Sequence, residues 1–391
     1  MKRLVPLVIF LLLLLSGCGT AQHGADYDAT WRLGLNAATC QEMNGGCYFS
    51  SVDTLYFIDS NTLTPVPLCS KPDCGHNRGS LDPDCDARFT FGSGQDSQFF
   101  CSDGSIYTAF STLNTSGEVS LVKMDPDGQN RKTVTTFSKG FRPTGGLVHR
   151  GCYYAIASAF REDGVRTDGI LQVDLSRGTQ KVLYALEPGL SPSMLTAYGG
   201  NLYYNTYRTD TKDPIAGRGI WCLELASGTS RRIEASEEGW VSLYAAFADG
   251  MLFTAEHTLD AFDTEADPVK RIYRRNLDGS GPELIFEGNG VLGSDGERLY
   301  LSRGWGSIDA DGTRGGPCIV IFSPDGEELD RVWLDGLPTG GFHMLSLFPG
   351  SGEQVLFACF DGSNNHLYRF PKAGIGSHAI RPEFVCSIDA T

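Results

Sequence analysis

The 391-residue sequence has no long apolar run after Leu15, which excludes a chain that crosses a membrane several times through helices. It also has no stretch of clear helical periodicity beyond its first seventeen residues, so a mainly helical fold is excluded. Positive charge is scarce, because 32 Lys and Arg residues stand against 47 Asp and Glu residues and give a formal net charge of −15. Such an acidic surface repels phosphate backbones, so we expect no nucleic-acid partner.

Diagnostic catalytic motifs are also missing. The chain contains no Gly-x-Ser-x-Gly nucleophile elbow, and no Gly-rich phosphate loop that follows a strand and opens a helix. Carboxylates are so numerous that an acid–base pair can always be drawn, and such a pair therefore carries little information. The sequence predicts no catalytic residue, although it leaves an enzyme possible.

The N-terminus carries a targeting signal. The basic start "MKR" is followed by an apolar stretch over residues 4–15 and then by "LSGC", which ends at Cys18. This is the pattern of a secretory signal, and the apolar stretch is shorter than the roughly 20 residues that a membrane-spanning helix requires. An ordinary signal peptide with a chance cysteine is one interpretation.

The "LSGC" ending resembles the lipobox of bacterial lipoproteins, and this resemblance implies cleavage before Cys18 and a lipid on its sulfur. We therefore expect a signal peptide over 1–17, a lipidated tether over 18–33 and a folded domain over 34–391. Two or more acyl chains suffice for stable anchoring. The expected location is the extracytoplasmic face of a bacterial cell membrane, with the lipid as the membrane contact.

A repeat runs along the rest of the chain. A glycine turn followed by a short apolar and aromatic strand recurs about every fifty residues. The seven instances are "NGGCYFS" (44–50), "SDGSIYT" (102–108), "HRGCYYA" (149–155), "YGGNLYY" (198–204), "ADGMLFT" (248–254), "SDGERLYL" (294–301) and "GSGEQVLF" (350–357). Each is followed by a second alternating strand that ends in a turn such as Asp-Gly or Ser-Gly, which is typical of hairpins.

Four strands per unit and seven units predict an all-β fold, a single β-propeller of seven four-stranded blades. Six or eight blades would follow if one repeat is miscounted. The strands "LYFID" and "LYYNT" and the turns "NLDGSG" and "SPDGEE" resemble the bacterial propellers related to the Tol–Pal translocation protein and to YWTD repeats. That resemblance implies the fold over nearly the whole mature chain, but no function.

Propeller topology predicts where a site would lie. The loops between the second and third strands, and the links between blades, share one rim and are long, so we call this the long-loop rim and expect binding there. The candidate residues are Tyr207, Arg208, Asp210 and Lys212 in one loop, His257, Asp260 and Asp263 in a second, and Arg303, Trp305, Asp309 and Asp311 in a third. An exposed Trp beside Asp and Arg suits a sugar ring, and the Asp-rich third loop weakly resembles a calcium site. The alternative for each loop is that its polar side chains are exposed to solvent and bind no ligand.

Without Cys18, eleven of the twelve cysteines remain, so at least one thiol lacks an internal disulfide partner. Five fall within strand patterns, where buried thiols are expected: Cys47, Cys152, Cys222, Cys318 and Cys359. Three lie near strand ends, where disulfides could form: Cys40, Cys101 and Cys386.

The remaining cysteines lie with a histidine in "LCSKPDCGHNRGSLDPDCDA" (68–87), in the link between the first two blades. Cys69, Cys74, His76 and Cys85 offer four interpretations. A disulfide between Cys69 and Cys74 is favoured, because a Pro72-Asp73 turn would bring these residues together. A structural zinc site of three thiolates and an imidazole comes next, followed by idle reduced thiols and by a redox or catalytic role.

The leading functional hypothesis is a binding or scaffold module for a cell-envelope protein or a glycan. One alternative is a carbohydrate hydrolase or lyase that uses carboxylates on the long-loop rim, and another is a structural component of an envelope assembly. Zinc, and more weakly calcium, are the possible cofactors. The ligand and the oligomeric state stay open.

Overall fold

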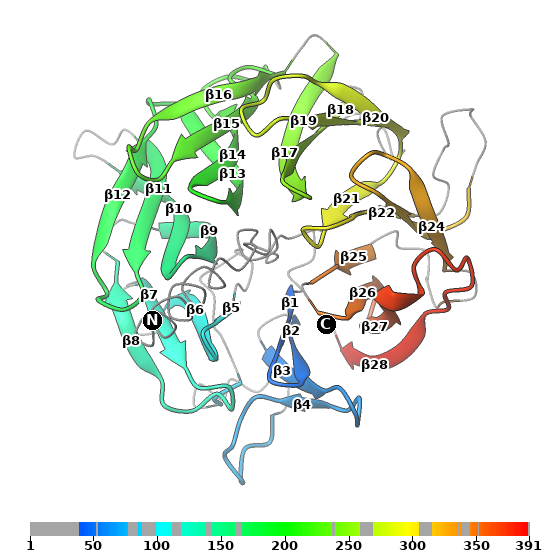
Figure 1. Cartoon of the computed structure of the whole chain (residues 1–391). Coiled ribbons are helices and arrows are strands. Elements are labelled where there is room, and N and C mark those ends of the chain that lie inside the picture. Colours follow the sequence, from blue (N-terminus) through cyan, green and yellow to red (C-terminus); the bar gives the residue numbers. More distant parts are fainter. Residues whose placement is uncertain are drawn as a thin grey trace, which may run out of the picture.

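The computed structural model of the chain forms a ring of seven four-stranded antiparallel sheets, a β-propeller, as predicted (Figure 1). It describes residues 39–389 apart from 52–53, 77–84, 88–98, 112–118, 138–141, 161–165, 214, 237–238, 259–268, 305–314, 335–336, 338–344 and 351. Each blade consists of four consecutive strands, with the first nearest the centre of the ring and the fourth outermost.

The first four blades lie between residues 39 and 235. They contain β1 (Thr39–Met43), β2 (Gly46–Ser51), β3 (Thr54–Asp59) and β4 (Pro65–Pro67), then β5 (Phe99–Ser102), β6 (Ser105–Ser111), β7 (Val119–Met124) and β8 (Lys132–Thr136). The third blade contains β9 (Arg142–His149), β10 (Cys152–Phe160), β11 (Arg166–Asp174) and β12 (Gln180–Ala185), and the fourth contains β13 (Leu190–Tyr198), β14 (Asn201–Arg208), β15 (Gly219–Glu224) and β16 (Ser230–Ala235).

The last three blades complete the ring. They contain β17 (Trp240–Ala248), β18 (Met251–Thr258), β19 (Lys270–Arg275) and β20 (Glu283–Gly288), then β21 (Val291–Ser294), β22 (Leu299–Arg303), β23 (Cys318–Phe322) and β24 (Glu328–Trp333). The seventh blade contains β25 (Leu345–Phe348), β26 (Gln354–Phe360), β27 (Asn364–Pro371) and β28 (Glu383–Asp389), with a short 3₁₀ helix, η3 (Lys372–Gly374), after β27.

The glycine turns of the repeat close hairpins between the first two strands of a blade. At Asn44-Gly45 and Asp249-Gly250 both turn residues have positive φ, which defines the type I′ geometry that matches strand twist. Glycine takes the second position because it adopts this conformation without a steric cost. The repeat therefore fixes the register of these hairpins.

Hydrophobic residues pack between neighbouring blades, so inner strands are buried on both faces. All five residues of β22 and all five of β23 are buried, whereas the outer strand β8 is largely accessible. One core cluster lies between blades 6 and 7 and includes Phe357 and Phe370. A blade cannot bury both faces alone, and the ring supplies the missing contacts.

Among the described residues the ring closes without an exchanged strand, because blade 1 contains β1–β4 and blade 7 contains β25–β28. An apolar cluster that includes Phe49 and Phe348 joins the two blades. Asn365 also donates a hydrogen bond to the Ser51 hydroxyl at 3.2 Å, although the two residues lie at opposite ends of the chain. Non-covalent packing therefore holds this seam.

The cysteines of the strands follow the predictions in part. Cys222, Cys318 and Cys359 are buried thiols, as expected, while Cys152 is only partly buried. The prediction for Cys47 was wrong, because a disulfide joins it to Cys40 across the β1–β2 hairpin, with the two Cα atoms 6.5 Å apart. The short turn places the two residues diagonally on neighbouring strands, within the separation that a disulfide requires.

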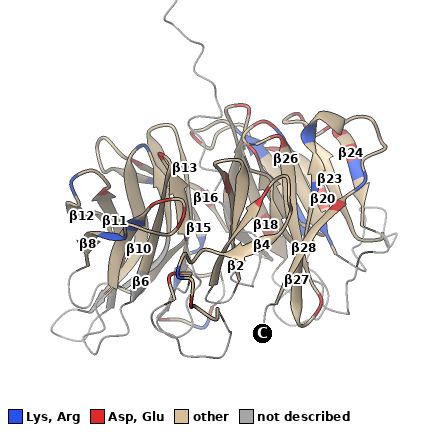
Figure 2. Ribbon diagram, turned by 90° about the horizontal axis from the view of Figure 1, so that it is seen from below, with Lys and Arg blue, Asp and Glu red and all other residues tan. Residues whose placement is uncertain are grey.

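Figure 2 shows the ring edge-on, with much of the charge toward the two rims. Antiparallel order places the turns between first and second strands, and between third and fourth strands, on one rim. The loops between second and third strands and the links between blades lie on the other, the long-loop rim. None of the helices in the described part of the chain is long and apolar enough to cross a membrane.

Candidate functional site

The cysteine-rich link begins where the outer strand of blade 1 stops early. Strand β4 has three residues, whereas its counterparts β8 and β12 have five and six. The backbone N–H of Leu68 donates to the carbonyl of Leu55 at 2.9 Å, and the N–H of Leu55 donates to the carbonyl of Ala87 at 2.8 Å. Leu55 in β3 is thus bonded to both Leu68 and Ala87. Both ends of the segment 69–86, which we call the excursion, are therefore held beside this one residue.

Local turns set the positions of the cysteines. Cys69 lies two residues after the end of β4, and the N–H of Cys74 donates to the carbonyl of Lys71 at 3.2 Å, which closes the predicted turn at Pro72-Asp73. Cys85 is buried beside Ala87 in an apolar cluster between blades 1 and 2, against which Cys69 and Cys74 also pack. No disulfide joins Cys69, Cys74 or Cys85 to another cysteine in the described part of the chain.

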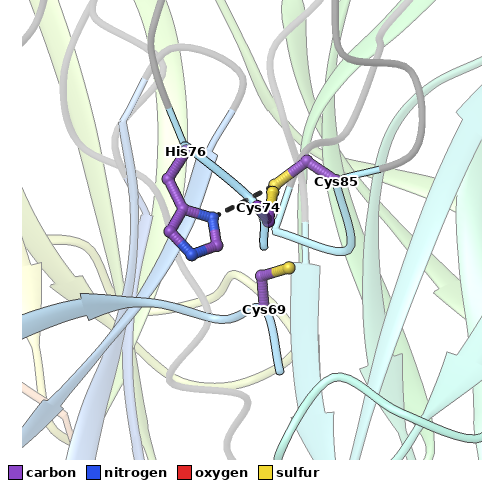
Figure 3. Close-up of side chains that lie close together, drawn as sticks. All are labelled: Cys69, Cys74, His76 and Cys85. Carbon is purple, nitrogen blue, oxygen red and sulfur yellow. Dashed lines mark hydrogen bonds between the residues drawn. The ribbon is translucent and has the colours of Figure 1, made fainter. Parts of the chain in front are cut away.

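The four side chains converge on one small space (Figure 3). The three sulfur atoms and a ring nitrogen of His76 all lie within 4.8 Å of one another, and Cys85 Sγ is 3.6 Å from His76 Nδ1. In a tetrahedral zinc site with bonds of 2.0–2.3 Å, ligand atoms lie about 3.6–3.8 Å apart. The cluster is therefore close to a coordination geometry and could hold a metal ion.

The residues around the cluster shift the pKa values of two of its thiols. Burial raises the pKa of Cys69, but hydrogen bonds with the backbone of Lys71 and Asp86 and with Cys74 and Cys85 together leave this pKa below its usual value. Burial raises the pKa of the Cys85 thiol to about 12. Lys71 and Asp86 form an ion pair at 3.3 Å, which links the two described halves of the excursion.

Arg131 brings positive charge to the cluster from the β7–β8 turn of blade 2. Burial lowers the pKa of its guanidinium, while the nearby Asp86, Cys85 and Cys69 raise it. A cation from blade 2 thus faces the acidic side of a link that starts in blade 1. A metal ion held by these cysteines would therefore lie at the contact between blades 1 and 2.

A second candidate region lies on the long-loop rim of blade 4. Arg208, at the end of β14, donates to Asp210 through two nitrogens, at 2.7 and 2.5 Å, and the Asp210 side chain is 48% exposed. The guanidinium of Arg218 lies over the ring of Tyr207, 5.8 Å from its centroid. Three of the predicted candidates, Tyr207, Arg208 and Asp210, therefore lie together at this rim, and Lys212 is exposed nearby.

A neighbouring pair on blade 5 was missed by the sequence analysis. The guanidinium of Arg271 lies 3.8 Å from the ring centroid of Trp240, and Arg271 also pairs with Glu287 at 3.1 Å. Trp240 opens β17 directly after an inter-blade link. The predicted rim candidates all come from loops between second and third strands, so this position was not among them. A search of the first residue after each link would have found it.

Two predicted rim residues lie in the interior instead. His257 and Arg303 sit near the rim ends of β18 and β22, but only 6% and 1% of their surfaces are exposed. The sequence pattern did not reveal that these two strand ends are buried. The other candidates of these loops, Asp260, Asp263, Trp305, Asp309 and Asp311, lie outside the described residues, as do Cys18 and the expected calcium loop.

Burial, followed by the charges of Lys270 and Arg218, lowers the pKa of His257 from 6.5 to about 4. The unfolded chain binds this proton more readily, so stability is complete above about pH 6.5 and is lost as the pH falls toward 4. Between about pH 7.5 and pH 5, we expect the unfolding free energy of the native chain to fall by roughly 2 kcal/mol more than that of His257→Gln. Urea unfolding at both pH values tests this, and equal losses in both proteins would contradict it.

The chain matches no known family model and no curated protein. Among solved structures it is similar to an oligogalacturonate lyase in complex with manganese, at 14% identity over 83% of this chain and 85% of the other, with a TM-score of 0.53. A puromycin hydrolase is 13% identical over 93% of this chain and 57% of its own, with a TM-score of 0.59. A putative TolB from Agrobacterium tumefaciens reaches a TM-score of only 0.38, at 15% identity over 73% of this chain and 84% of its own. The similarities to the lyase and the hydrolase show the propeller fold and nothing finer.

Proposed function

We propose that the protein is a lipid-anchored propeller on the extracytoplasmic side of a bacterial membrane, and that it binds another envelope protein through the long-loop rim of blades 4 and 5. The observation that carries this proposal is the pair of arginine–aromatic contacts there, Tyr207 with Arg218 and Trp240 with Arg271. Tyr, Trp and Arg are the residues most enriched at the energetic centres of protein interfaces.

The two contacts lie on adjacent blades, because Tyr207 is in β14 of blade 4 and Trp240 is in β17 of blade 5. Both aromatic residues stand at strand ends, in β14 and β17, so ordering them on binding costs little entropy. The exposed Arg208–Asp210 and Arg271–Glu287 ion pairs add charges of both signs at the edge. A partly apolar centre with a charged border suits a protein partner.

The anchor rests on the N-terminal "MKR", the apolar residues 4–15 and Cys18. Lipid on Cys18 would hold the propeller at the membrane surface, where its partners are other envelope proteins. Labelling of the intact chain with a radioactive fatty acid, with Cys18→Ala as the control, checks this part separately from the binding surface.

The binding surface is tested with a photo-crosslinking residue at Asp210 in the full chain, in cells. We expect one discrete adduct with an envelope protein. Trp240→Ala should weaken the purified complex by about thirtyfold, equivalent to roughly 2 kcal/mol for an interface hot spot. Isothermal titration of the identified partner measures the change.

Blade 6 offers the matched control, because Arg331 lies over the ring of Trp333 at 5.6 Å on the outer strand β24. Trp333→Ala is expected to leave the affinity unchanged. If no adduct forms at Asp210, or if Trp240→Ala binds as tightly as the native chain, the proposal is wrong. Glycan-array binding or turnover of a polysaccharide by the same protein would instead favour the carbohydrate-linked alternatives.

A further inference from the structure

We propose that Cys69, Cys74, His76 and Cys85 bind one Zn²⁺ ion, which acts as a structural clamp on the link between blades 1 and 2. This inference is independent of the proposed binding surface, since the link and the rim of blades 4 and 5 are different parts of the ring. Four observations support it: the ligand set, the spacing of the ligand atoms, the charge around them and the course of the backbone.

The ligand set selects the metal. Three thiolates and an imidazole are soft or borderline ligands, which favour zinc and disfavour calcium, magnesium and manganese. The four ligand atoms lie within 4.8 Å of one another, so a modest closure of the cluster brings all of them to tetrahedral distances. Four protein ligands leave no open position for a substrate or water, which is the arrangement of structural zinc sites.

The metal also accounts for all four side chains, whereas a disulfide does not. Any disulfide among Cys69, Cys74 and Cys85 would leave the third thiol and His76 without a role. Outside the loop, Cys40 is already joined to Cys47, and Cys101, which packs against the same apolar cluster, is a free thiol. His76 adopts a positive φ of 46°, an uncommon backbone conformation, and its ring nitrogen lies 3.6 Å from Cys85 Sγ.

The charge balance of the site is favourable. Binding converts three thiols to thiolates and releases three protons, and Zn²⁺ with three thiolates and a neutral imidazole carries one net negative charge. The guanidinium of Arg131, close to Cys69 and Cys85, compensates that charge from blade 2. The ion pair of Lys71 with Asp86, at 3.3 Å, lies beside the ligands Cys69 and Cys85 in the sequence.

The backbone shows what the clamp would hold. Strand β4 has only three residues, and the backbone of Leu55 is bonded both to Leu68, just before the excursion, and to Ala87, just after it. Cys69, Cys74 and His76 come from the outgoing half and Cys85 from the returning half. A metal between the halves would cross-link them where no strand ladder does, so its binding energy would add to the stability of the ring.

The test uses the full chain produced with zinc and purified in detergent under reducing conditions without a histidine tag. We expect one zinc per chain by elemental analysis, and release of that zinc by a chelator with a lower melting temperature that added zinc restores. Cobalt in place of zinc should give the intense visible and charge-transfer bands of tetrahedral thiolate coordination. The double variant Cys74→Ser/Cys85→Ser should bind zinc at least about a hundredfold more weakly.

Two controls keep the result decisive. Cys152→Ser removes another partly buried thiol, outside the loop, and should retain one zinc. His76→Cys keeps four ligands and should also retain it. The proposal is overturned if the native chain contains no zinc, if a disulfide is mapped between two loop cysteines in chain purified without reductant, or if the double serine variant keeps its zinc. Because the chelator and cobalt measurements use the native chain, misfolding of a variant cannot decide the outcome.

Discussion

Replacing Phe357 by alanine is expected to lower the free energy of unfolding by about 3–5 kcal/mol. Phe357 lies in β26 and is fully buried between blades 6 and 7. Its ring stacks on Tyr368 at a centroid distance of 5.4 Å and packs against Phe370 at 6.3 Å. Truncation removes buried apolar surface and leaves a cavity that neighbouring strands, held in their ladders, can only partly fill.

The same blade provides the control for this variant. Phe384, in β28, is 50% exposed and touches Tyr368 edge-on at 5.5 Å. We expect Phe384→Ala to cost less than about 1 kcal/mol, since much less surface leaves water on folding. Urea unfolding followed by fluorescence measures both. Equal losses for the two variants would show that blade 7 does not pack on blade 6 as described.

A second large effect is expected at a buried ion pair between blades 4 and 5. Arg275 Nη2 lies 2.6 Å from Glu234 Oε2, and the two side chains are only 12% and 6% exposed. Thr254 also donates to Glu234 at 2.6 Å and accepts from Arg275 at 2.9 Å. Arg275→Ala should lower the free energy of unfolding by about 3–5 kcal/mol, because it leaves a carboxylate buried without its counter-ion.

The cost comes from the stranded charge rather than from the pair itself. The double variant Glu234→Leu/Arg275→Met should therefore recover most of the stability that Arg275→Ala loses. The adjacent Arg274 is the matched control, since it pairs with Glu283 and Asp325 at an accessible site, and Arg274→Ala should cost less than about 1 kcal/mol. Thermal and urea unfolding give all three values. A double variant that is less stable than Arg275→Ala would contradict this explanation.

The fold could be predicted because its signals are local and repeated. Glycine turns with positive φ, such as Asn44-Gly45, Asp103-Gly104 and Asp249-Gly250, close hairpins between first and second strands, and alternating apolar residues mark the strands on each side. Seven repetitions of the same unit leave few other closed architectures. The seam between blades 1 and 7 was beyond this reasoning, since Asn365 and Ser51 meet only when the ring closes.

The candidate sites could be predicted only in part. The Pro72-Asp73 turn was predicted because it depends on neighbouring residues alone. His257 and Arg303 were expected at the rim and are buried, because burial at a strand end depends on the adjacent blade. The Trp240–Arg271 contact was missed since the two residues are thirty-one positions apart and meet across the strands of blade 5.

The sequence by itself determined the all-β class, the seven units and the unusual composition of residues 68–87, because turn chemistry and side-chain periodicity act over a few residues. Tertiary structure decided which distant groups meet. It joined Cys40 to Cys47 and left Cys69, Cys74 and Cys85 as thiols beside His76. The reason is geometric: Leu55 holds both ends of the excursion, and that constraint, which no local pattern encodes, brings the four side chains to one point.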